Sequence, residues 1–176
     1  MMSNLRYLLL GQNEFEGTLE DILNCGNCTN TLERFTSQQN ALNGEIPNRL
    51  FDFSKLSMFR VMDSKLTGTI PSGIGQMTAL TELNLQQNTR FLESNTLPSE
   101  LGNLTNLQAL LLSGSTIGGT IPLELGNLSK LTTLALVQTS LSGSIADGIC
   151  EIDGLSIMYS SEITCSCPDN KCQNAA

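Results

Sequence analysis

Hydrophobic residues recur along this chain with one spacing, in which an aliphatic residue is followed by buried-type residues three and five positions later. The first residues of six such units are Leu5, Leu32, Leu56, Leu80, Leu107 and Leu131, and they lie 27, 24, 24, 27 and 24 residues apart. Alternation of apolar and other residues within a unit, as at Leu110 and Leu112, predicts a short β-strand with one buried face. Repetition at this period predicts stacked units that bury their leucines against one another.

The residues after each predicted strand repeat as well, and they explain how the chain turns back. An asparagine or a small hydroxyl residue comes first, at Asn13, Asn40, Ser64, Asn88, Ser115 and Thr139. Its side chain can pair with backbone groups at the bend. Most units continue with an apolar residue, a glycine and then Ile-Pro or a close copy, as at Ile121 and Pro122. Glycine permits a tight backbone path, and proline suits an extended return segment.

This pattern resembles the plant-specific class of leucine-rich repeats, LxxLxLxxNxLxGxIPxxLGxLxx. The match is clearest from Leu107 to Pro122, and it extends from Leu5 to about Leu155. The resemblance implies an α/β solenoid, a right-handed superhelix of about six repeats. It would carry a parallel β-sheet on its concave face and 3-10 or irregular segments on its convex face. We expect the solenoid over residues 1–154, followed by a degenerate repeat and a cysteine-containing cap over residues 155–176.

Several units depart from the pattern: unit one is long, unit six has Ala146 in place of proline, and units two and four differ most. Unit two has Ser37 where other units have a buried leucine or valine, so we expect a weak point in the core there. Unit four carries three extra residues between Arg90 and Asn95 and lacks the glycine, so we expect the chain to bulge.

Composition and charge narrow the functions that the chain can perform. It has 17 acidic and nine basic side chains, a formal net charge of −8, and no histidine. Nucleic-acid binding needs clustered lysine and arginine, which are scattered singly here, so we expect no nucleic-acid partner. No apolar run approaches the roughly 18 residues that span a bilayer, so we expect no membrane insertion. The densest acidic cluster, at Glu14, Glu16, Glu20 and Asp21, is interpreted as a solvated convex loop.

The residue types in the chain give little support to an enzymatic function. Without histidine the chain lacks the usual general base and the commonest metal ligand. No phosphate-binding loop, nucleophile elbow or dinucleotide fingerprint occurs in it. We therefore expect no catalytic site, no metal and no cofactor.

The chain has six cysteines, namely Cys25, Cys28, Cys150, Cys165, Cys167 and Cys172. The last four lie where the repeat pattern ends, and they are similar to the cysteine-bearing caps of extracellular leucine-rich-repeat proteins. We expect them to form disulfides, and three pairings are open. Free thiols and a zinc site are the alternatives, although the spacing fits no common zinc finger. The first two resemble a C-x-x-C redox pair, but without a βαβ context a local disulfide is favoured.

Secretion is indicated by three N-glycosylation sequons, which begin at Asn27, Asn103 and Asn127. With the cysteines and the family resemblance, they predict an extracellular or cell-surface protein. The first residues nevertheless lack the apolar segment of a signal peptide, and the first repeat starts at once. We interpret the chain as a fragment, and we expect an exposed apolar first layer at Leu5, Leu8 and Leu10.

Side chains that alternate with the buried leucines should face solvent on the concave side, where a ligand would bind. The candidate ligand-binding residues there are Arg34, Gln38, Arg60, Glu82, Asn84, Gln86, Leu111, Ala135 and Val137. An apolar stripe at Leu111, Ala135 and Val137, beside polar residues of units two to four, would suit a protein or peptide. The alternative is that these aliphatic residues are merely tolerated on an open strand surface.

The sequence therefore predicts a non-catalytic recognition module that resembles plant receptor ectodomains and binds a protein or peptide. Two alternatives stay open: a secreted, wall-associated inhibitor similar to polygalacturonase-inhibiting proteins, and a structural fragment with no ligand of its own.

Overall fold

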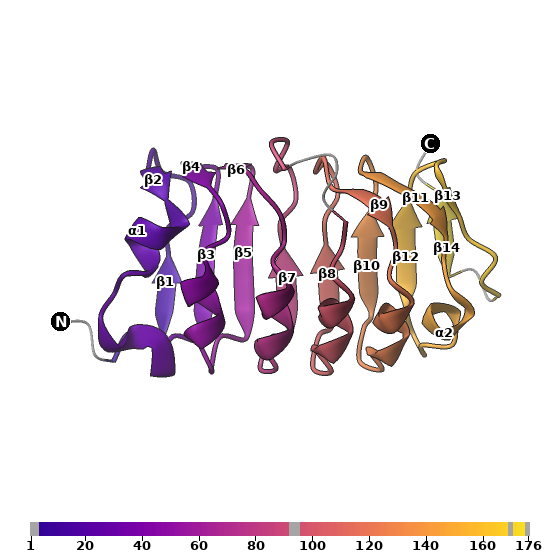
Figure 1. The fold of residues 1–176 in the computed structure, drawn as a ribbon, viewed down its shortest axis with the longest axis horizontal. Helices are drawn as coiled ribbons and strands as arrows, with labels where there is room; N and C mark the ends of the chain where they lie inside the picture. The colour runs from indigo at the N-terminus through magenta and orange to yellow at the C-terminus, as the bar shows by residue number, and fades with distance from the viewer. Residues whose placement is uncertain (1–3, 92–95, 169–170, 175–176) are drawn as a thin grey trace.

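A computed structural model describes residues 4–91, 96–168 and 171–174 of the chain. Over these residues the chain winds into a solenoid whose turns stack side by side from the N-terminus to the C-terminus (Figure 1). Each regular turn gives one strand to a shared parallel sheet and returns through a short helical segment on one side of that sheet. The predicted leucine-rich-repeat solenoid is confirmed.

The main sheet has eight parallel strands. In spatial order they are β1 (Tyr7–Leu9), β3 (Arg34–Gln38), β5 (Met58–Met62), β7 (Glu82–Asn84), β8 (Ala109–Leu111), β10 (Thr133–Leu136), β12 (Ser156–Tyr159) and β14 (Cys172–Asn174). Equivalent positions of neighbouring turns lie opposite one another, as Leu83, Leu110 and Leu134 do. The strands β12 and β14 extend the sheet beyond the sixth regular turn.

Short helices cover one side of the main sheet, as seen in front of it in Figure 1. They are α1 (Leu19–Leu23), η1 (Asn27–Asn30), η2 (Asn48–Asp52), η3 (Ser72–Gln76), η4 (Ser99–Asn103), η5 (Leu123–Asn127) and α2 (Asp147–Cys150), where η denotes a 3-10 helix. A proline with extended backbone directly precedes each of η2 to η5. Its carbonyl accepts the first hydrogen bond of the helix, as Pro98 does from Leu101 at 3.1 Å. Proline suits this position because its φ is already fixed near the observed value and it has no N–H to leave unpaired.

A glycine that follows Ile74 or Leu101 in the helical segments allows successive helices to pack closely. A side-chain carbon on Gly75 would lie only 2.7 Å from the backbone oxygen of Glu100 in the next helix. A side-chain carbon on Gly102 would likewise collide with the backbone of Glu124. The repeat therefore needs glycine here because a neighbouring backbone occupies the space of a side chain.

A second layer of short strands lies past the end of the main strands, and the described residues form two separate sheets in it. Its two three-stranded sheets are β2 (Glu16–Thr18), β4 (Ala41–Gly44) and β6 (Lys65–Leu66), and β9 (Gly118–Thr120), β11 (Ser140–Ser144) and β13 (Ile163–Thr164). Unit four, whose insertion was expected to bulge, lies between these two sheets in the sequence. Residues 92–95 of that insertion lie outside the described part of the chain. Phe91 before them is buried, and its carbonyl accepts a hydrogen bond from the Thr116 hydroxyl at 2.6 Å.

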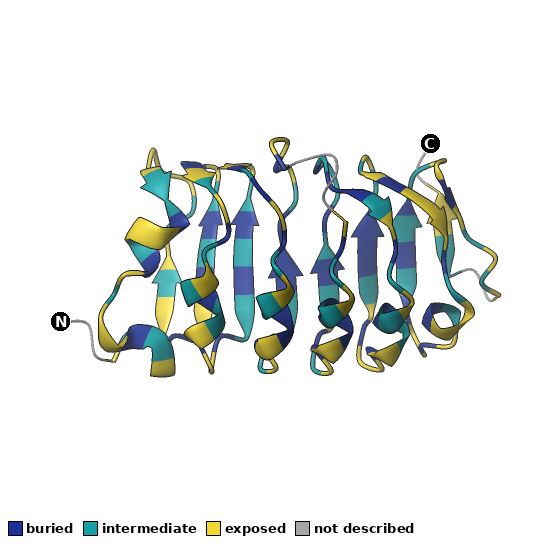
Figure 2. Ribbon diagram, viewed as in Figure 1, coloured by how far each residue is buried: buried dark blue, intermediate teal, exposed yellow. Residues whose placement is uncertain are grey.

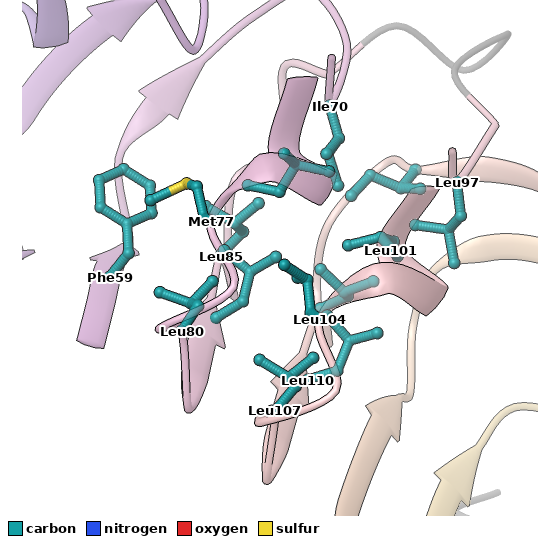
Figure 3. Packing of buried hydrophobic residues seen from close by; sticks show 14 of the residues in the cluster. Phe59, Ile70, Met77, Leu80, Leu85, Leu97, Leu101, Leu104, Leu107 and Leu110 are labelled. Carbon is teal, nitrogen blue, oxygen red and sulfur yellow. The ribbon is translucent and has the colours of Figure 1, made fainter. Parts of the chain in front are cut away.

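A single leucine-rich core runs between the main sheet and the helices through all regular turns. The burial pattern alternates along strands such as β5 and β8, and buried residues recur at equivalent positions from turn to turn (Figure 2). Figure 3 shows side chains of successive turns, among them Leu85, Leu104 and Leu110, meeting in this core. Each fully buried leucine contributes roughly 1.5–3 kcal/mol relative to an exposed one, so stacking is the main source of stability.

Two expected irregularities of the core can be located. Ser37 is fully buried, and its hydroxyl accepts a hydrogen bond from the Asn40 amide at 3.1 Å, so this polar group is paired. The first layer, Leu5, Leu8 and Leu10, is half-buried and lines an apolar hollow of about 690 Å³. That layer is thus covered less completely than the leucines of the following turns.

Asparagines at the bend after the strands join neighbouring turns. The Asn88 amide nitrogen donates to the carbonyls of Val61 (2.7 Å) and Leu85 (3.0 Å), and its oxygen accepts from the Leu66 amide (3.3 Å). Ser115 occupies the same position in the next unit, and its hydroxyl donates only within its own turn, to Leu112 at 2.6 Å. Asparagine therefore adds hydrogen bonds between turns that serine does not replace.

The stacking register predicts opposite outcomes for two aspartate substitutions. Leu110→Asp would place a carboxylate in the buried column without a partner, so we expect a loss of more than about 4 kcal/mol of unfolding free energy. Val137→Asp changes the open side of the sheet and should cost less than about 1 kcal/mol. Thermal unfolding followed by circular dichroism measures both, and equal melting temperatures would contradict the register.

The hydrogen bonds of Asn88 to the neighbouring turn predict a second difference in stability between two variants. Asn88→Ala leaves buried backbone groups of Val61 and Leu66 unpaired, and we expect a cost of about 2–3 kcal/mol. Ser115→Ala should cost about 1 kcal/mol or less, because the Leu112 carbonyl still accepts from the Ser115 backbone amide. Urea unfolding of the two variants provides the comparison. An Asn88 variant no less stable than the Ser115 variant would show that the bonds between turns do not stabilise the fold.

Candidate ligand-binding surface

The side of the main sheet that the helices leave uncovered is the candidate binding surface, and we call it the open sheet face. Because side chains alternate along a strand, each turn presents its remaining residues there in registered rows. One row contains Tyr7, Arg34, Met58, Glu82, Ala109 and Thr133. The next row contains Leu9, Thr36, Arg60, Asn84, Leu111, Ala135 and Met158.

Seven of the nine predicted ligand-binding residues are accessible on this face. Arg34 is exposed, and the half-buried ones are Gln38, Arg60, Glu82, Gln86, Leu111 and Val137. The expected solvent exposure was wrong for Asn84 and Ala135, which are only 4% and 2% exposed. Both are short side chains between longer ones in their row, and the Asn84 oxygen also accepts the Gln86 backbone amide at 3.2 Å.

An ion pair lies in the middle of the open sheet face and holds the side chains of Arg60 and Glu82 in a defined position. The Arg60 guanidinium donates two hydrogen bonds of 2.6 Å to the two carboxylate oxygens of Glu82 on the neighbouring strand. This bonding raises the pKa of Arg60 above its ordinary value. Two-pronged pairing of this kind has a defined geometry, so it offers a ligand a rigid polar group that is already neutralised.

The N-terminal end of the face carries a free cation beside an aromatic ring. The guanidinium groups of Arg6 and Arg34 lie 5.5 and 5.6 Å from the centre of the Tyr7 ring. Arg6 is also paired with Glu33 through two 2.9 Å hydrogen bonds, which lower the pKa of the Glu33 carboxyl. Among the residues that the structure describes, the ion pairs are those of Arg6 and Arg60. Arg34 therefore keeps its charge available for a ligand.

The opposite end of the face is apolar. Leu111 and Val137 lie there as predicted, and Met158 of β12 continues the row beyond Ala135. Nearer the middle of the face, Met58 and Met62 flank Arg60 on β5 and are also half-buried. The sequence reasoning did not single out Met158, because the last turn departs from the leucine pattern that would have placed it. Methionine adapts its shape to different partners, so these side chains suit a contact surface.

A further row of polar residues follows the edge where the main strands end, and we call it the left-handed row. Gln12, Gln39, Asp63, Gln87 and Gln138 have left-handed backbones with φ of 58°, 55°, 47°, 59° and 55°. Gly114 has the equivalent place in unit five with a φ of 72°. For most residues this conformation costs roughly 1–2 kcal/mol. Hydrogen bonds to the next turn impose it, as when the Gln39 amide donates to the Met62 carbonyl at 3.2 Å.

The comparisons with known proteins agree with this geometry. A family model described as Leucine Rich Repeat matches residues 106–128. The ectodomain of the Arabidopsis thaliana receptor kinase GASSHO1/SCHENGEN3, in complex with CASPARIAN STRIP INTEGRITY FACTOR 2, is 31% identical with a TM-score of 0.83. The chain is a leucine-rich-repeat protein. No curated protein matches it significantly.

Other solved structures show how widely the fold is used. The ectodomain of the Arabidopsis receptor kinase HAESA, in complex with an IDA peptide hormone ligand, is 32% identical with a TM-score of 0.74. A plant ice-binding protein, 24% identical with a TM-score of 0.76, shares the fold; 90% of this chain and 49% of that one are covered. The GASSHO1/SCHENGEN3 match covers 93% of the leucine-rich-repeat chain but only 19% of the receptor ectodomain. The HAESA match covers 86% of this chain and 26% of the ectodomain.

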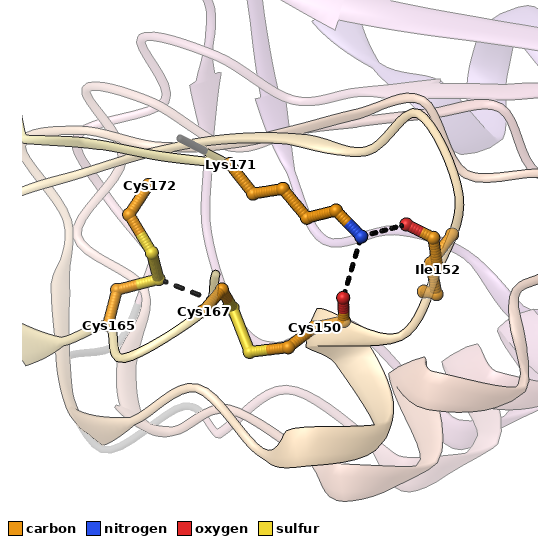
Figure 4. Close-up of a disulfide and its surroundings, with 6 residues drawn as sticks. All are labelled: Cys150, Ile152, Cys165, Cys167, Lys171 and Cys172. Carbon is orange, nitrogen blue, oxygen red and sulfur yellow. Dashed lines mark hydrogen bonds between the residues drawn. A yellow bond between two sulfur atoms is a disulfide. The ribbon is translucent and has the colours of Figure 1, made fainter. Parts of the chain in front are cut away.

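Disulfides close the C-terminal end of this leucine-rich-repeat protein. Cys150 is bonded to Cys167 and Cys165 to Cys172, and the Cys165 and Cys167 sulfurs lie 3.6 Å apart (Figure 4). Lys171 donates to the carbonyls of Cys150 and Ile152 at 2.7 and 2.8 Å, where α2 ends. The last carbonyls of a helix have no partner within the helix, so a cation such as Lys171 suits this position.

The remaining predicted sites lie outside the open sheet face. Cys25 and Cys28 form a local disulfide, as favoured from the sequence. Asn27, Asn103 and Asn127 are exposed, and their glycosylation stays a prediction. Within the described residues, no helix has the length and apolar character that crossing a membrane requires.

The ion pair of Arg6 predicts a measurable pKa change. Arg6→Gln should move the pKa of the Glu33 carboxyl upward toward its ordinary value, because the charged donor is lost. Arg60→Gln, which removes the other paired arginine, should leave it unchanged. The stabilisation of the native pair is present above the ordinary pKa of glutamate and is lost as the pH falls through the lowered native value. Carboxyl NMR titration tests this, and an identical Glu33 pKa in wild type and Arg6→Gln would disprove the assignment.

Proposed function

We propose that this chain is a non-catalytic recognition module that binds a peptide or protein on its open sheet face. The observation that carries the proposal is the arrangement of this face. A free cation at Arg34, a fixed ion pair at Arg60 and Glu82, and an apolar end at Leu111, Val137 and Met158 follow one another across adjacent strands. Binding surfaces combine apolar anchors with a few placed polar groups in this way.

An extended peptide is the ligand that fits the face best. Neighbouring strands lie about 4.8 Å apart, so the strands from β1 to β10 span about 24 Å. An extended peptide rises about 3.3 Å per residue, so about seven residues would cross these turns. Such a ligand would place an acidic group near Arg34 and an apolar side chain near Val137. The peptide-bound HAESA ectodomain supports the proposal by likeness of fold, although it is much longer than this chain.

An extracellular or cell-surface location belongs to the same proposal. The three disulfides are typical of proteins that mature in an oxidising compartment. The receptor ectodomains supply an analogy for such a location.

The experiment is a selection from a displayed library of random twelve-residue peptides against the folded chain. We expect enriched peptides that combine acidic and apolar residues, and we expect Val137→Asp to weaken their binding at least tenfold. Leu123→Asp is the matched control, because Leu123 is an exposed aliphatic residue on η5, away from the open sheet face. Isothermal titration calorimetry with a selected peptide measures both variants.

Two results would contradict the proposal. One is a selection that yields no peptide whose binding depends on Val137, which would favour a scaffold without a ligand of this kind. The other is equal weakening by Leu123→Asp, which would place the contact on the helical side.

A further inference from the structure

A polar groove runs along the edge where strands β1, β3, β5 and β7 end, separate from the open sheet face. It has a volume of about 720 Å³ and is lined by residues that follow these strands and by Glu16, Ala41 and Lys65 of β2, β4 and β6. Four consecutive turns contribute to it, and three of its residues, Gln39, Asp63 and Gln87, belong to the left-handed row. Among the described residues that line it, Ala41 alone has no polar side-chain atom.

The left-handed row indicates that side chains are kept here in spite of backbone strain. Glycine adopts this conformation without penalty, and unit five has glycine, Gly114, with the same kind of hydrogen bond to the next turn (2.8 Å to the Val137 carbonyl). The fold therefore accepts glycine at this place. Where such strained residues also line a groove, as Gln39, Asp63 and Gln87 do, their side chains are candidates for binding a ligand.

The chemistry of the groove favours an uncharged, hydroxyl-rich ligand. A carboxamide both donates and accepts hydrogen bonds at one tip, as paired hydroxyl groups demand. The charged residues have both signs, with Glu14, Glu16 and Asp63 against Lys65 and Arg90, and no ion pair joins any of these five to another residue that the structure describes. A polyanionic ligand would be repelled by the carboxylates of Glu14, Glu16 and Asp63. A peptide would find no apolar pocket for the anchor side chains on which peptide binding depends.

We infer that this groove binds a neutral oligosaccharide chain that lies across the turns. Equivalent residues of neighbouring turns repeat at about 4.8 Å, which is close to the length of one hexose unit in a β-1,4-linked chain. Successive sugars would then meet successive turns and accept hydrogen bonds from Gln39 and Gln87 and donate to Asp63. The site is distinct from the peptide surface proposed above, so either proposal can fail without the other.

The test is calorimetric titration of the folded chain with cellohexaose and with laminarihexaose. We expect one of them to bind, and we expect the double variant Gln39→Gly/Gln87→Gly to weaken that binding at least tenfold. Gln138→Gly is the matched control, because Gln138 has the same left-handed backbone and does not line the groove. It should change the affinity less than twofold. Val137→Asp, on the open sheet face, should also leave sugar binding intact.

Stability is measured in parallel, because it separates binding from folding. All these glycine variants should melt at or above the wild-type temperature, since glycine relieves the strain. Failure of both sugars to bind would overturn the inference, and so would equal weakening by Gln138→Gly. Stronger binding of a Gly-Ser hexapeptide or of an oligogalacturonate in the same groove would overturn it in favour of a peptide or an acidic glycan.

Discussion

Each turn of this solenoid has an apolar side that it cannot cover by itself, and the rest of the structure follows from that constraint. Leu83, Leu110 and Leu134 are buried because equivalent leucines lie opposite them in the next turn. The close approach of the turns requires glycine where helices meet, as at Gly75. Asn88 adds hydrogen bonds between turns at the bend. The fold is therefore a sum of similar contacts between neighbours.

Places where the repetition changes show how far the stacking tolerates irregular sequence. At unit four, which carries the insertion, the main sheet and the leucine core continue directly from β7 to β8. The stacked core therefore does not require a regular repeat at that turn. At the C-terminal end β12 and β14 extend the sheet, and two disulfides with Lys171 hold the cap against it.

The sequence alone predicted the strands, the buried column and the bend residues, because each depends on spacing within the chain. It could not predict that Asn84 and Ala135 are buried, because their exposure depends on the size of neighbours in other turns. The pairing of the C-terminal cysteines depends on how the cap folds back, which spacing does not encode. The left-handed row was missed for a similar reason, since hydrogen bonds to the next turn impose that conformation. The one local indication of this conformation in the sequence was Gly114, a glycine at the position that Gln87 and Gln138 occupy in their own units.

Each strand has one set of side chains in the core and another on the open sheet face, and this separation connects the fold to the proposed function. One set of side chains forms the core, and the backbone is paired with neighbouring strands, so the fold makes few demands on the side chains of the open sheet face. Arg34, Val137 and Met158 are free to serve recognition for that reason. The same holds for the polar groove at the strand ends, where the fold demands a backbone conformation and leaves the side chain unspecified.

Native-state hydrogen exchange tests the central claim that one continuous core joins all regular turns. If it does, the slowest amides of β5, β7, β8 and β10 exchange at one common free energy, set by unfolding of the whole chain. If the turns before and after unit four instead exchange at two separate free energies, the core is divided at the insertion, and the account of a single stacked column is wrong.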